Sequence, residues 1–498
     1  MKLDGESWER AAWSSLPEEG KILFVVLDDL PYNDHEKKWG FMCMQEMTLC
    51  AQRLRTYHIE TYGCQMNVRD SETIAGMLEE MGLRRAANMQ EAGLILFNTC
   101  CVRDHAERRV FGNVGFVRLM KDERPETVVA VCGCMMQQDG VAERLFRRFP
   151  FVDLVFGTHV LHRLPQMLEA VMHGERLCVT SEEDGQIVEG LPSKRQEGQS
   201  AFVNIMFGCN NYCTYCIVPY VRGHERSRMP EAIREEVRAL AAQGYTEITL
   251  LGQNVNSYGR GLPCDVDFPD LLHLLNDVDG IRRIRFMTSH PKDLSPKLID
   301  AMASLSKVCH HIHLPLQSGS NRVLQAMNRR YTREQYLHLV EELRAAVPDV
   351  ELTTDVIVGF PGETEQDFLD TMDMMRRVGF AAAYTFQYSP RAGTKAASME
   401  DQVPPESKSR RLQALNALQT ELTEQNNRKY LGHSGEILVE GAGQRDGTPI
   451  AFGKLSNFKM VYFPGNEALI GSYLPVRITE IRSNSLFGER EETQHEYD

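Results

Sequence analysis

No long hydrophobic run occurs in this sequence. Its longest apolar stretches, such as KILFVVL at residues 21–27, are far shorter than the roughly 20 residues that a transmembrane helix requires. The first ten residues, MKLDGESWER, carry acidic side chains and no apolar segment of the kind that a secretory signal contains. These two absences predict a cytoplasmic protein that has no membrane partner.

The sequence also contains fewer basic residues than acidic residues. The chain has 55 lysine and arginine residues against 69 aspartate and glutamate residues, which gives a net charge of −14. This balance argues against indiscriminate binding to nucleic acid, although it is compatible with a local basic groove. A chain of 498 residues is too long for one hydrophobic core, so we expect several domains.

Cysteine, by contrast, is abundant, with 13 residues in the chain. Because a secretory signal is lacking, these cysteines indicate thiolate chemistry in a reducing compartment rather than disulfide bonds. Their positions therefore bear directly on the chemistry that the protein supports.

The pattern of apolar segments predicts an α/β protein with several parts. Residues 1–55 show no clear period and are interpreted as an N-terminal extension of unknown role. Residues 56–180 alternate short apolar strands with helical stretches, which is typical of a doubly wound parallel sheet. Residues 181–200 form a polar linker to the next domain.

Six strand–helix units follow in residues 201–432. This series predicts a partial TIM-like barrel, whose ligands would bind at the carboxyl ends of the strands. Residues 433–498 contain short β runs interrupted by glycine and proline, and they predict a small antiparallel β-barrel.

Three cysteines, Cys209, Cys213 and Cys216, follow the first strand of the six-unit series with the spacing C-x3-C-x2-C. Three thiolates so close together can each hold one iron of a cubic four-iron cluster, which leaves the fourth iron open for a substrate or cofactor. The alternative is a zinc knuckle that takes its fourth ligand from His224. Zinc knuckles usually contain paired CxxC motifs, and this sequence has no second CxxC.

A second set of cysteines, Cys64, Cys100 and Cys134, stands at the ends of three predicted strands in the first domain. The carboxyl ends of parallel strands meet at one edge of a sheet, where such folds bind ligands. We therefore predict that this set holds a second four-iron cluster, again with one open iron. The neighbouring Cys101 and Cys132 are expected to be packing residues, because of their positions along the strands.

The C-x3-C-x2-C motif, with the aromatic Tyr215 before its third cysteine, resembles that of the radical S-adenosylmethionine superfamily. The resemblance implies that the open iron chelates S-adenosylmethionine, whose reductive cleavage yields a 5′-deoxyadenosyl radical. Tyr215 is accordingly a candidate for cofactor binding. Further candidates follow from their position at the carboxyl ends of predicted strands: Gln253, Asn254, Gln317, Ser318 and the glycine-rich residues 358–364.

Both cysteine sets, within the segments TYGCQMNVRDSE, NTCCVRDHAE, CGCM and FGCNNYCTYC, resemble the methylthiotransferases, which replace a C–H bond by C–S–CH3. The resemblance covers about residues 56–495 and includes a C-terminal barrel similar to the RNA-binding TRAM domain. It is greatest to the branch that acts on isopentenylated adenosine next to the tRNA anticodon. It implies an enzyme that converts N6-isopentenyladenosine in tRNA to its 2-methylthio derivative, with two 4Fe-4S clusters and S-adenosylmethionine as cofactors.

The same resemblance implies the partners: the tRNA anticodon stem-loop, an external low-potential electron donor and a sulfur source. The protein is expected to be a monomer. Two alternatives stay open. One is a sister methylthiotransferase that acts on threonylcarbamoyladenosine in tRNA or on an aspartate of a ribosomal protein. The other is a non-enzymatic iron–sulfur protein that binds RNA as a redox sensor, which would leave the two sets of three cysteines unexplained.

Composition gives the RNA-binding prediction weaker support. Some of the arginines after the cysteine motif and in residues 321–333 are expected to contact phosphate: Arg222, Arg226, Arg228, Arg322, Arg329, Arg330 and Arg333. Aromatic and lysine side chains lie on or near the strands of the last domain, and a minority of the rings is expected to stack on unpaired bases: Phe452, Phe458, Tyr462 and Phe463, with Lys454 and Lys459.

Overall fold

The computed structural model describes residues 23–26, 54–101, 104–181, 186–195, 198–482 and 485–491. The chain divides into two compact units, Met1–Lys194 and Arg195–Asp498, called unit 1 and unit 2 below. Unit 2 contains both the six-strand series and the C-terminal barrel. Within the described ranges, no helix is both long enough and apolar enough to cross a membrane.

Unit 1 contains a seven-stranded sheet in which all neighbouring strands are parallel. The central strands are buried along their whole length and are mainly apolar, as expected for a parallel sheet covered on both faces. The first strand comes from the segment that we interpret as an extension. In sheet order the strands are β1 (Leu23–Val26), β7 (Leu177–Thr180), β6 (Leu154–Phe156), β5 (Val128–Gly133), β4 (Leu94–Thr99), β2 (Thr56–Thr61) and β3 (Arg84–Arg85).

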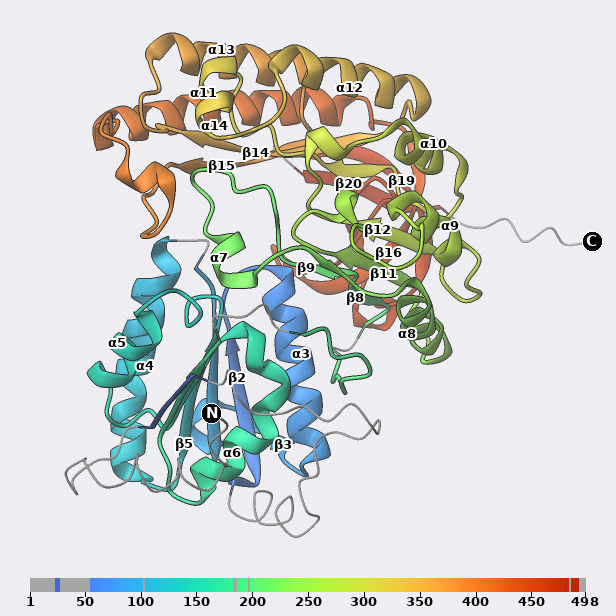
Figure 1. Ribbon diagram of the computed structural model, residues 1–498. Helices are drawn as coiled ribbons and strands as arrows, with labels where there is room; N and C mark the ends of the chain where they lie inside the picture. Colours follow the sequence, from blue (N-terminus) through green and yellow to red (C-terminus); the bar gives the residue numbers. More distant parts are fainter. Residues whose placement is uncertain are drawn as a thin grey trace, which may run out of the picture. The chain divides into compact units, whose positions relative to one another are not determined.

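Helices flank this sheet on both faces. Leu78 and Leu168, from two different helices, share a core with Leu96 of β4. Phe97, the next residue of β4, is equally buried but points to the opposite face, because side chains alternate along a strand. In Figure 1, α4 and α5 lie across the sheet from α3. The helices are α3 (Gln65–Glu80), α4 (Asp104–Glu123), α5 (Val141–Arg148) and α6 (Leu164–Met172).

Unit 2 begins with six parallel strands that follow one another in chain order. They form two three-stranded sheets, and an isolated parallel bridge between Ile284 and Val308 links the two. The predicted six-strand series is therefore observed, with a break in regular pairing at its centre. The strands are β8 (Ser200–Asn204), β11 (Glu247–Leu251) and β12 (Arg283–Phe286) in one sheet, and β13 (His311–His313), β14 (Glu351–Val358) and β15 (Ala382–Gln387) in the other.

Helices between these strands start where the sequence supplies a cap. Asp267, Thr332 and Thr364 each form a capping box, in which the cap side chain and the third helical residue satisfy each other's backbone N–H groups. The helices cover one large apolar core that extends through all six strands. They are α8 (Pro230–Ala242), α9 (Phe268–Asn276), α10 (Pro296–Ser304), α11 (Asn321–Ala326), α12 (Arg333–Ala346), α13 (Glu365–Val378) and α14 (Pro405–Arg428).

The last five strands close into a barrel, in the order β16-β17-β18-β20-β19. The prediction of an antiparallel barrel is wrong for one pair, because β18 and β20 run parallel. Strand direction cannot alternate around a closed ring of five, so one neighbouring pair must run in the same direction. The strands are β16 (Ser434–Arg445), β17 (Thr448–Lys454), β18 (Met460–Pro464), β19 (Tyr473–Arg482) and β20 (Ser485–Arg490).

A loop of this barrel reaches the six-strand series. Phe458, between β17 and β18, stacks on the His311 ring of β13 with 4.5 Å between ring centroids. Arg285 of β12 is buried and donates to the carbonyl oxygens of Leu455 and Ser456. These contacts explain why the two parts behave as one compact unit.

Candidate functional site

The first cysteine set lies on three adjacent strands of unit 1. Cys64 follows β2, Cys100 follows β4 and Cys134 follows β5. Strand β4 pairs with β2 on one side and β5 on the other, all in parallel. The three cysteines therefore stand side by side at the carboxyl edge of the sheet, as the sequence predicts.

Close backbone packing holds these cysteines. Gly63 has a φ of 112°, and a Cβ atom added there would lie 2.7 Å from the Cys100 Sγ atom. Gly133, before Cys134, has a φ of 98° and would bring a Cβ to 2.4 Å from the Thr99 carbonyl oxygen. Only glycine adopts these backbone angles readily and also lacks the side chain that would clash here. The two glycine turns therefore fix where the cysteines lie.

Asn67 lies between the cysteines and was not singled out from the sequence. It is fully buried, and its Nδ2 atom donates to the carbonyl oxygens of Tyr62 and Thr99, both at 2.8 Å. Its Oδ1 atom lies 4.0 Å from the Cys64 Sγ and 3.7 Å from the Cys134 Sγ. Asn67 thus connects two of the loops that carry the cysteines. The only local signal was its position three residues after Cys64.

The neighbouring cysteines have a different environment. Cys132 lies within β5 and belongs to the apolar core of unit 1, so its prediction as a packing residue is confirmed. Cys101 is also buried, one residue beyond Cys100. Cys43 and Cys50 lie outside the described residues.

The second cysteine set lies in one loop of unit 2, between the short strands β9 (Met206–Phe207) and β10 (Arg226–Ser227), with α7 (Val218–Arg222) inside it. Cys209 and Cys213 are buried, whereas Cys216 is half-buried. Backbone hydrogen bonds fix the loop at both ends: Cys209 N donates to Gly223 O at 3.1 Å, and Thr214 N donates to Met327 O at 3.0 Å.

The environment of this loop disfavours free thiolates. Burial raises the pKa of Cys209 to about 11 and, together with the neighbouring Cys213, raises the pKa of Cys216 to about 12. Without a cation these thiols stay protonated at neutral pH. A bound iron supplies the positive charge that makes the thiolates favourable, so the donor set fits an iron–sulfur cluster.

Arg329 contributes a buried positive charge beside this loop. Its Nη1 atom donates to the Cys213 Sγ at 3.5 Å and its Nη2 atom to the Pro315 carbonyl oxygen at 3.1 Å. Its guanidinium group also lies 5.2 Å from the centre of the Tyr331 ring. Arg329 is one of the arginines that the sequence offers as candidates for phosphate contact, but in the structure its buried guanidinium group lies beside Cys213.

Among the other side chains considered for RNA contact, some are buried and others are half-buried or exposed. Arg222 and Arg228 are buried like Arg329, so little of these three side chains is exposed for a phosphate contact. Phe463 belongs to the core of the C-terminal barrel, and Phe458 faces His311. Several remaining side chains are half-buried or exposed: Phe452, Tyr462, Arg226, Arg330 and Lys454.

The candidates for S-adenosylmethionine binding differ in how well they fit a ligand. Gln317 is buried in a left-handed conformation, and its Oε1 atom has no hydrogen-bond partner. Asn254 donates to Asp293 at 2.8 Å, while its own Oδ1 atom is buried without a partner. Such orphaned acceptors are costly unless a ligand satisfies them. These two residues therefore fit a polar ligand.

The remaining candidates are engaged within the protein. The Ser318 hydroxyl is fully buried and lies 3.4 Å from the Thr371 hydroxyl. The Tyr215 ring packs against an apolar cluster that includes Met327 and Phe360. Gln253 is half-buried beside Asn254, at the end of β11.

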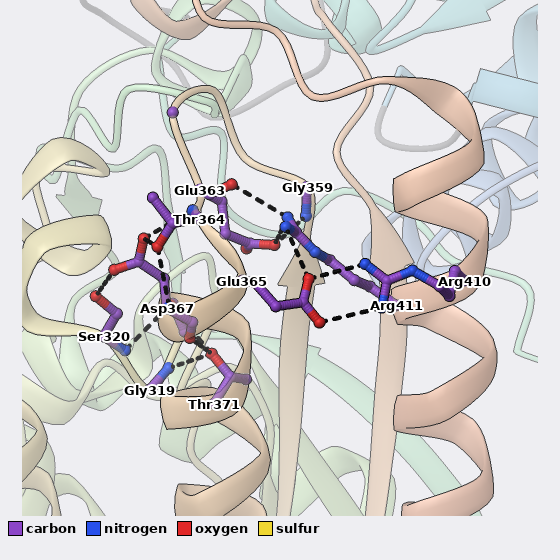
Figure 2. Close-up of polar contacts among 12 residues, drawn as sticks. Gly319, Ser320, Gly359, Glu363, Thr364, Glu365, Asp367, Thr371, Arg410 and Arg411 are labelled. Atoms are coloured by element: carbon purple, nitrogen blue, oxygen red, sulfur yellow. Dashed lines mark hydrogen bonds and ion pairs between the residues drawn. The ribbon is translucent and has the colours of Figure 1, made fainter.

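The glycine-rich turn after β14 is fixed by a buried ion pair. Glu363 accepts from Gly359 N at 2.9 Å and from Arg411 Nη1 of α14 at 2.7 Å, and both charged side chains are buried. Asp367 of α13 accepts from Ser320 Oγ at 2.6 Å. Figure 2 shows how these residues tie the loops after β13 and β14 to the two helices.

No single-ion site is formed by the described side chains, because no three His, Cys, Asp or Glu groups among them come close enough to hold one metal ion. His224, the proposed fourth zinc ligand, instead lies 3.1 Å through its Nε2 atom from the Tyr212 hydroxyl. A cubic cluster, by contrast, binds each thiolate to a different iron and does not require three ligands around one ion.

Three family models match successive parts of the chain. Residues 203–375 match the Radical SAM superfamily, residues 56–157 match Uncharacterized protein family UPF0004, and residues 428–490 match the TRAM domain. A tRNA-2-methylthio-N(6)-dimethylallyladenosine synthase of Caldicellulosiruptor saccharolyticus is 53% identical over 436 residues, which cover 87% of this chain and 92% of that protein. The chain belongs to this synthase family. A relative with the same name from Syntrophomonas wolfei is 54% identical, over 87% of this chain and 97% of its own.

Solved structures agree with this family in fold. A radical S-adenosylmethionine methyltransferase, TsrM from Kitasatospora setae, solved with cobalamin and a [4Fe-4S] cluster, is similar with a TM-score of 0.51 and 15% identity. The similarity covers 69% of this chain and 77% of that chain. A second structure of TsrM, with tryptophan and an S-adenosylmethionine analogue, has a TM-score of 0.50, 15% identity and coverage of 66% and 72%. At this identity the likeness concerns the fold alone.

Proposed function

We propose that this synthase-family protein converts N6-dimethylallyladenosine, next to the tRNA anticodon, into its 2-methylthio derivative. The observation that carries the proposal is the pair of cysteine sets, one at the carboxyl edge of the parallel sheet of unit 1 and one in the loop between β9 and β10 of unit 2, in a chain whose relatives bear the name of this reaction. The acceptor in that name favours this substrate over threonylcarbamoyladenosine or a ribosomal-protein aspartate. A redox sensor would not require two clusters with open irons.

Two 4Fe-4S clusters and S-adenosylmethionine are the proposed cofactors. Cys209, Cys213 and Cys216 would hold one cluster, and the three cysteines of unit 1 would hold the other. When bound, these groups supply an electron for cleavage of S-adenosylmethionine and an open iron on which sulfur is mounted.

The residues around the second cysteine set have proposed roles in positioning. Arg329 places a fixed positive charge beside Cys213, where it would offset the negative charge of a cluster and its sulfur ligands. Gln317 and Asn254 offer unpaired amide oxygens to the polar groups of S-adenosylmethionine. The turn at Gly359, held by Glu363, is proposed to line the same pocket.

The boundaries and types of the domains are also part of the proposal. We infer a doubly wound first domain over residues 56–180, a linker over 181–200, a partial barrel over 201–432 and an RNA-binding barrel over 433–498. The protein would act as a cytoplasmic monomer on the anticodon stem-loop. An external electron donor and a sulfur source would complete the reaction.

A comparison of two triple variants tests this function. Replacing Cys64, Cys100 and Cys134 by alanine should abolish the methylthio product but leave reductive formation of 5′-deoxyadenosine, because the other cluster keeps its ligands. Replacing Cys209, Cys213 and Cys216 should abolish both products. Cys132→Ala is the control, because Cys132 packs in the core of unit 1. Repeated turnover to methylthiolated tRNA by the first triple variant would contradict the proposed sulfur mount.

A further inference from the structure

Two large aromatic side chains on β15 stay unusually exposed. Tyr384 is 47% exposed and Phe386 is 39% exposed, although the strand belongs to the sheet that borders the main core of unit 2. Exposed aromatic side chains that lie next to each other on one strand mark a surface that gains from being covered.

Hydrogen bonds to α14 identify that face. Thr385 donates to Asn416 at 2.5 Å and Gln387 donates to Ser409 at 3.3 Å, so these residues face the helix. Side chains alternate along a strand, and Tyr384 and Phe386 must therefore project to the opposite, inner face. The Tyr384 ring indeed lies 5.9 Å from the ring of His313 on β13, which places both side chains on that face.

The amino-terminal part of the same inner face is already covered by the protein. Phe458 stacks on His311, and the Thr353 hydroxyl lies 3.0 Å from His311 Nε2 and 3.1 Å from His313 Nδ1. Tyr384 and Phe386 follow further along the parallel strands, toward the carboxyl ends. The inner face is thus closed at one end by the C-terminal barrel and exposed at the other.

The exposed part is connected to the second cysteine set through one apolar cluster. Phe386 pairs in register with Ile357 of β14. Ile357 packs against the apolar cluster that also receives Tyr215, which lies between Cys213 and Cys216 in the sequence. A group resting on Phe386 would therefore lie beside the segment in which we propose that the radical forms.

A carboxylate stands next to the two rings. Asp355 pairs in register with Tyr384, and its Oδ2 atom lies 3.5 Å from His313 Nε2, so it too projects from the inner face. An adenine with one substituent at N6 retains one N–H group at that nitrogen. An apolar wall beside a hydrogen-bond acceptor matches an N6-dimethylallyl adenine, which presents a five-carbon apolar chain beside that N–H.

We propose that Tyr384 and Phe386 form the wall that receives the N6-dimethylallyl group, and that Asp355 accepts the N6–H. This inference rests on the proposed function and adds the residues that determine substrate specificity. The apolar chain covers the two rings and removes their surface from water. Adenosine without the substituent leaves them exposed, and it therefore binds less well.

The experiment measures binding as well as turnover. Two anticodon stem-loops, which differ only in the presence of the dimethylallyl group, are titrated against the full-length protein by fluorescence anisotropy. Wild type should bind the modified stem-loop at least about tenfold more tightly, because an apolar pocket discriminates by about this factor for even one methylene group. Phe386→Ala and Tyr384→Ala should lose most of that preference, and Tyr384→Phe should keep it.

The matched control is Leu369→Ala, which removes an exposed apolar side chain from α13. This variant should keep the wild-type preference and should still form 5′-deoxyadenosine when RNA is absent. An equal loss of affinity for both stem-loops in Phe386→Ala would overturn the proposal, since it would assign the wall to general RNA contact. Unchanged affinities would overturn it too. If wild type forms no methylthio product on the modified stem-loop, the proposed function itself fails.

Discussion

His311 is a titratable side chain that is buried in the interior of unit 2. It lies between the Phe458 ring and the Thr353 hydroxyl, with almost no exposure to water. Burial, followed by the nearby Arg285, lowers the pKa of His311 well below its ordinary value of 6.5. The side chain is therefore neutral in the folded protein under conditions in which it is charged in the unfolded chain.

This difference predicts how stability depends on pH. Below about pH 6.5 the unfolded chain binds a proton at His311 that the folded protein does not bind, so acid favours unfolding. The free energy of unfolding should fall by about 1.4 kcal/mol per pH unit from this one group. In His311→Phe the slope between pH 6.5 and 5 should be smaller by that amount, as measured by urea unfolding at each pH. Identical slopes would show that His311 is charged in the folded state.

At the scale of an element, α14 supports the turn that follows β14. Arg411 of this helix pairs with Glu363 inside the protein, whereas the adjacent Arg410 pairs with Glu365 at the surface. Burial raises the pKa of Glu363, and the Gly359 N–H and Arg411 oppose that rise. The helix therefore stabilises the ionised carboxylate that holds the Gly359 backbone.

The two arginines provide a matched pair of variants. Arg411→Met leaves a buried carboxylate without its cation and should cost about 3–5 kcal/mol of stability. Arg410→Met removes only an exposed ion pair and should change stability little. Urea unfolding measures both effects. Arg411→Met should also raise the KM for S-adenosylmethionine more than Arg410→Met does, because the turn that is proposed to line its pocket loses a restraint. Equal effects from both variants would contradict this role of α14.

At the scale of the whole molecule, the C-terminal barrel is part of the body of unit 2. Arg285 is buried in an ion pair with Glu247 at 2.9 Å, and the barrel loop supplies the carbonyl oxygens that accept from its Nη1 and Nη2 atoms. Arg283 likewise donates to the carbonyl oxygens of Glu436 and Lys454. The barrel thus satisfies charges that belong to the six-strand series.

Removing residues 433–498 should consequently do more than weaken tRNA binding. The truncated protein would leave the donors of Arg283 and Arg285 without their carbonyl partners, and it should unfold at a lower urea concentration than the full chain. Phe458→Ala, which removes only the stacked ring, should cost about 1–3 kcal/mol. A truncated protein as stable as the full chain would show that the barrel contributes only to RNA binding.

Iron content is a second property of the whole molecule. The anaerobically prepared protein should hold about eight irons, four for each cysteine set. Replacing Cys209, Cys213 and Cys216 together should leave about half of the iron, since the remaining set lies in the other unit. Retention of all the iron, measured by a colorimetric assay, would require a different assignment of the ligands.

Much of the fold and of the site followed from local patterns. The alternation of apolar strands and amphipathic helices predicted the six-strand series. The positions of the cysteines after predicted strands identified both cysteine sets. The pairing of β2, β4 and β5 then explains why Cys64, Cys100 and Cys134 meet at one edge. By contrast, the barrel of five strands contains a parallel pair, because closure is a property of the whole ring and no single segment encodes it.

The sequence by itself determined the class of fold, the two sets of cysteines and the family, because periodicity and spacing are recorded in neighbouring residues. Only the tertiary structure decided which charged and aromatic side chains face water. Arg329 was one of several candidates for phosphate contact and is buried at Cys213, while Phe458 was one of four rings considered for base stacking and stacks on His311. Tyr384 and Phe386 looked like ordinary strand residues and are exposed. Burial depends on contacts between segments distant in the chain, which no local pattern contains.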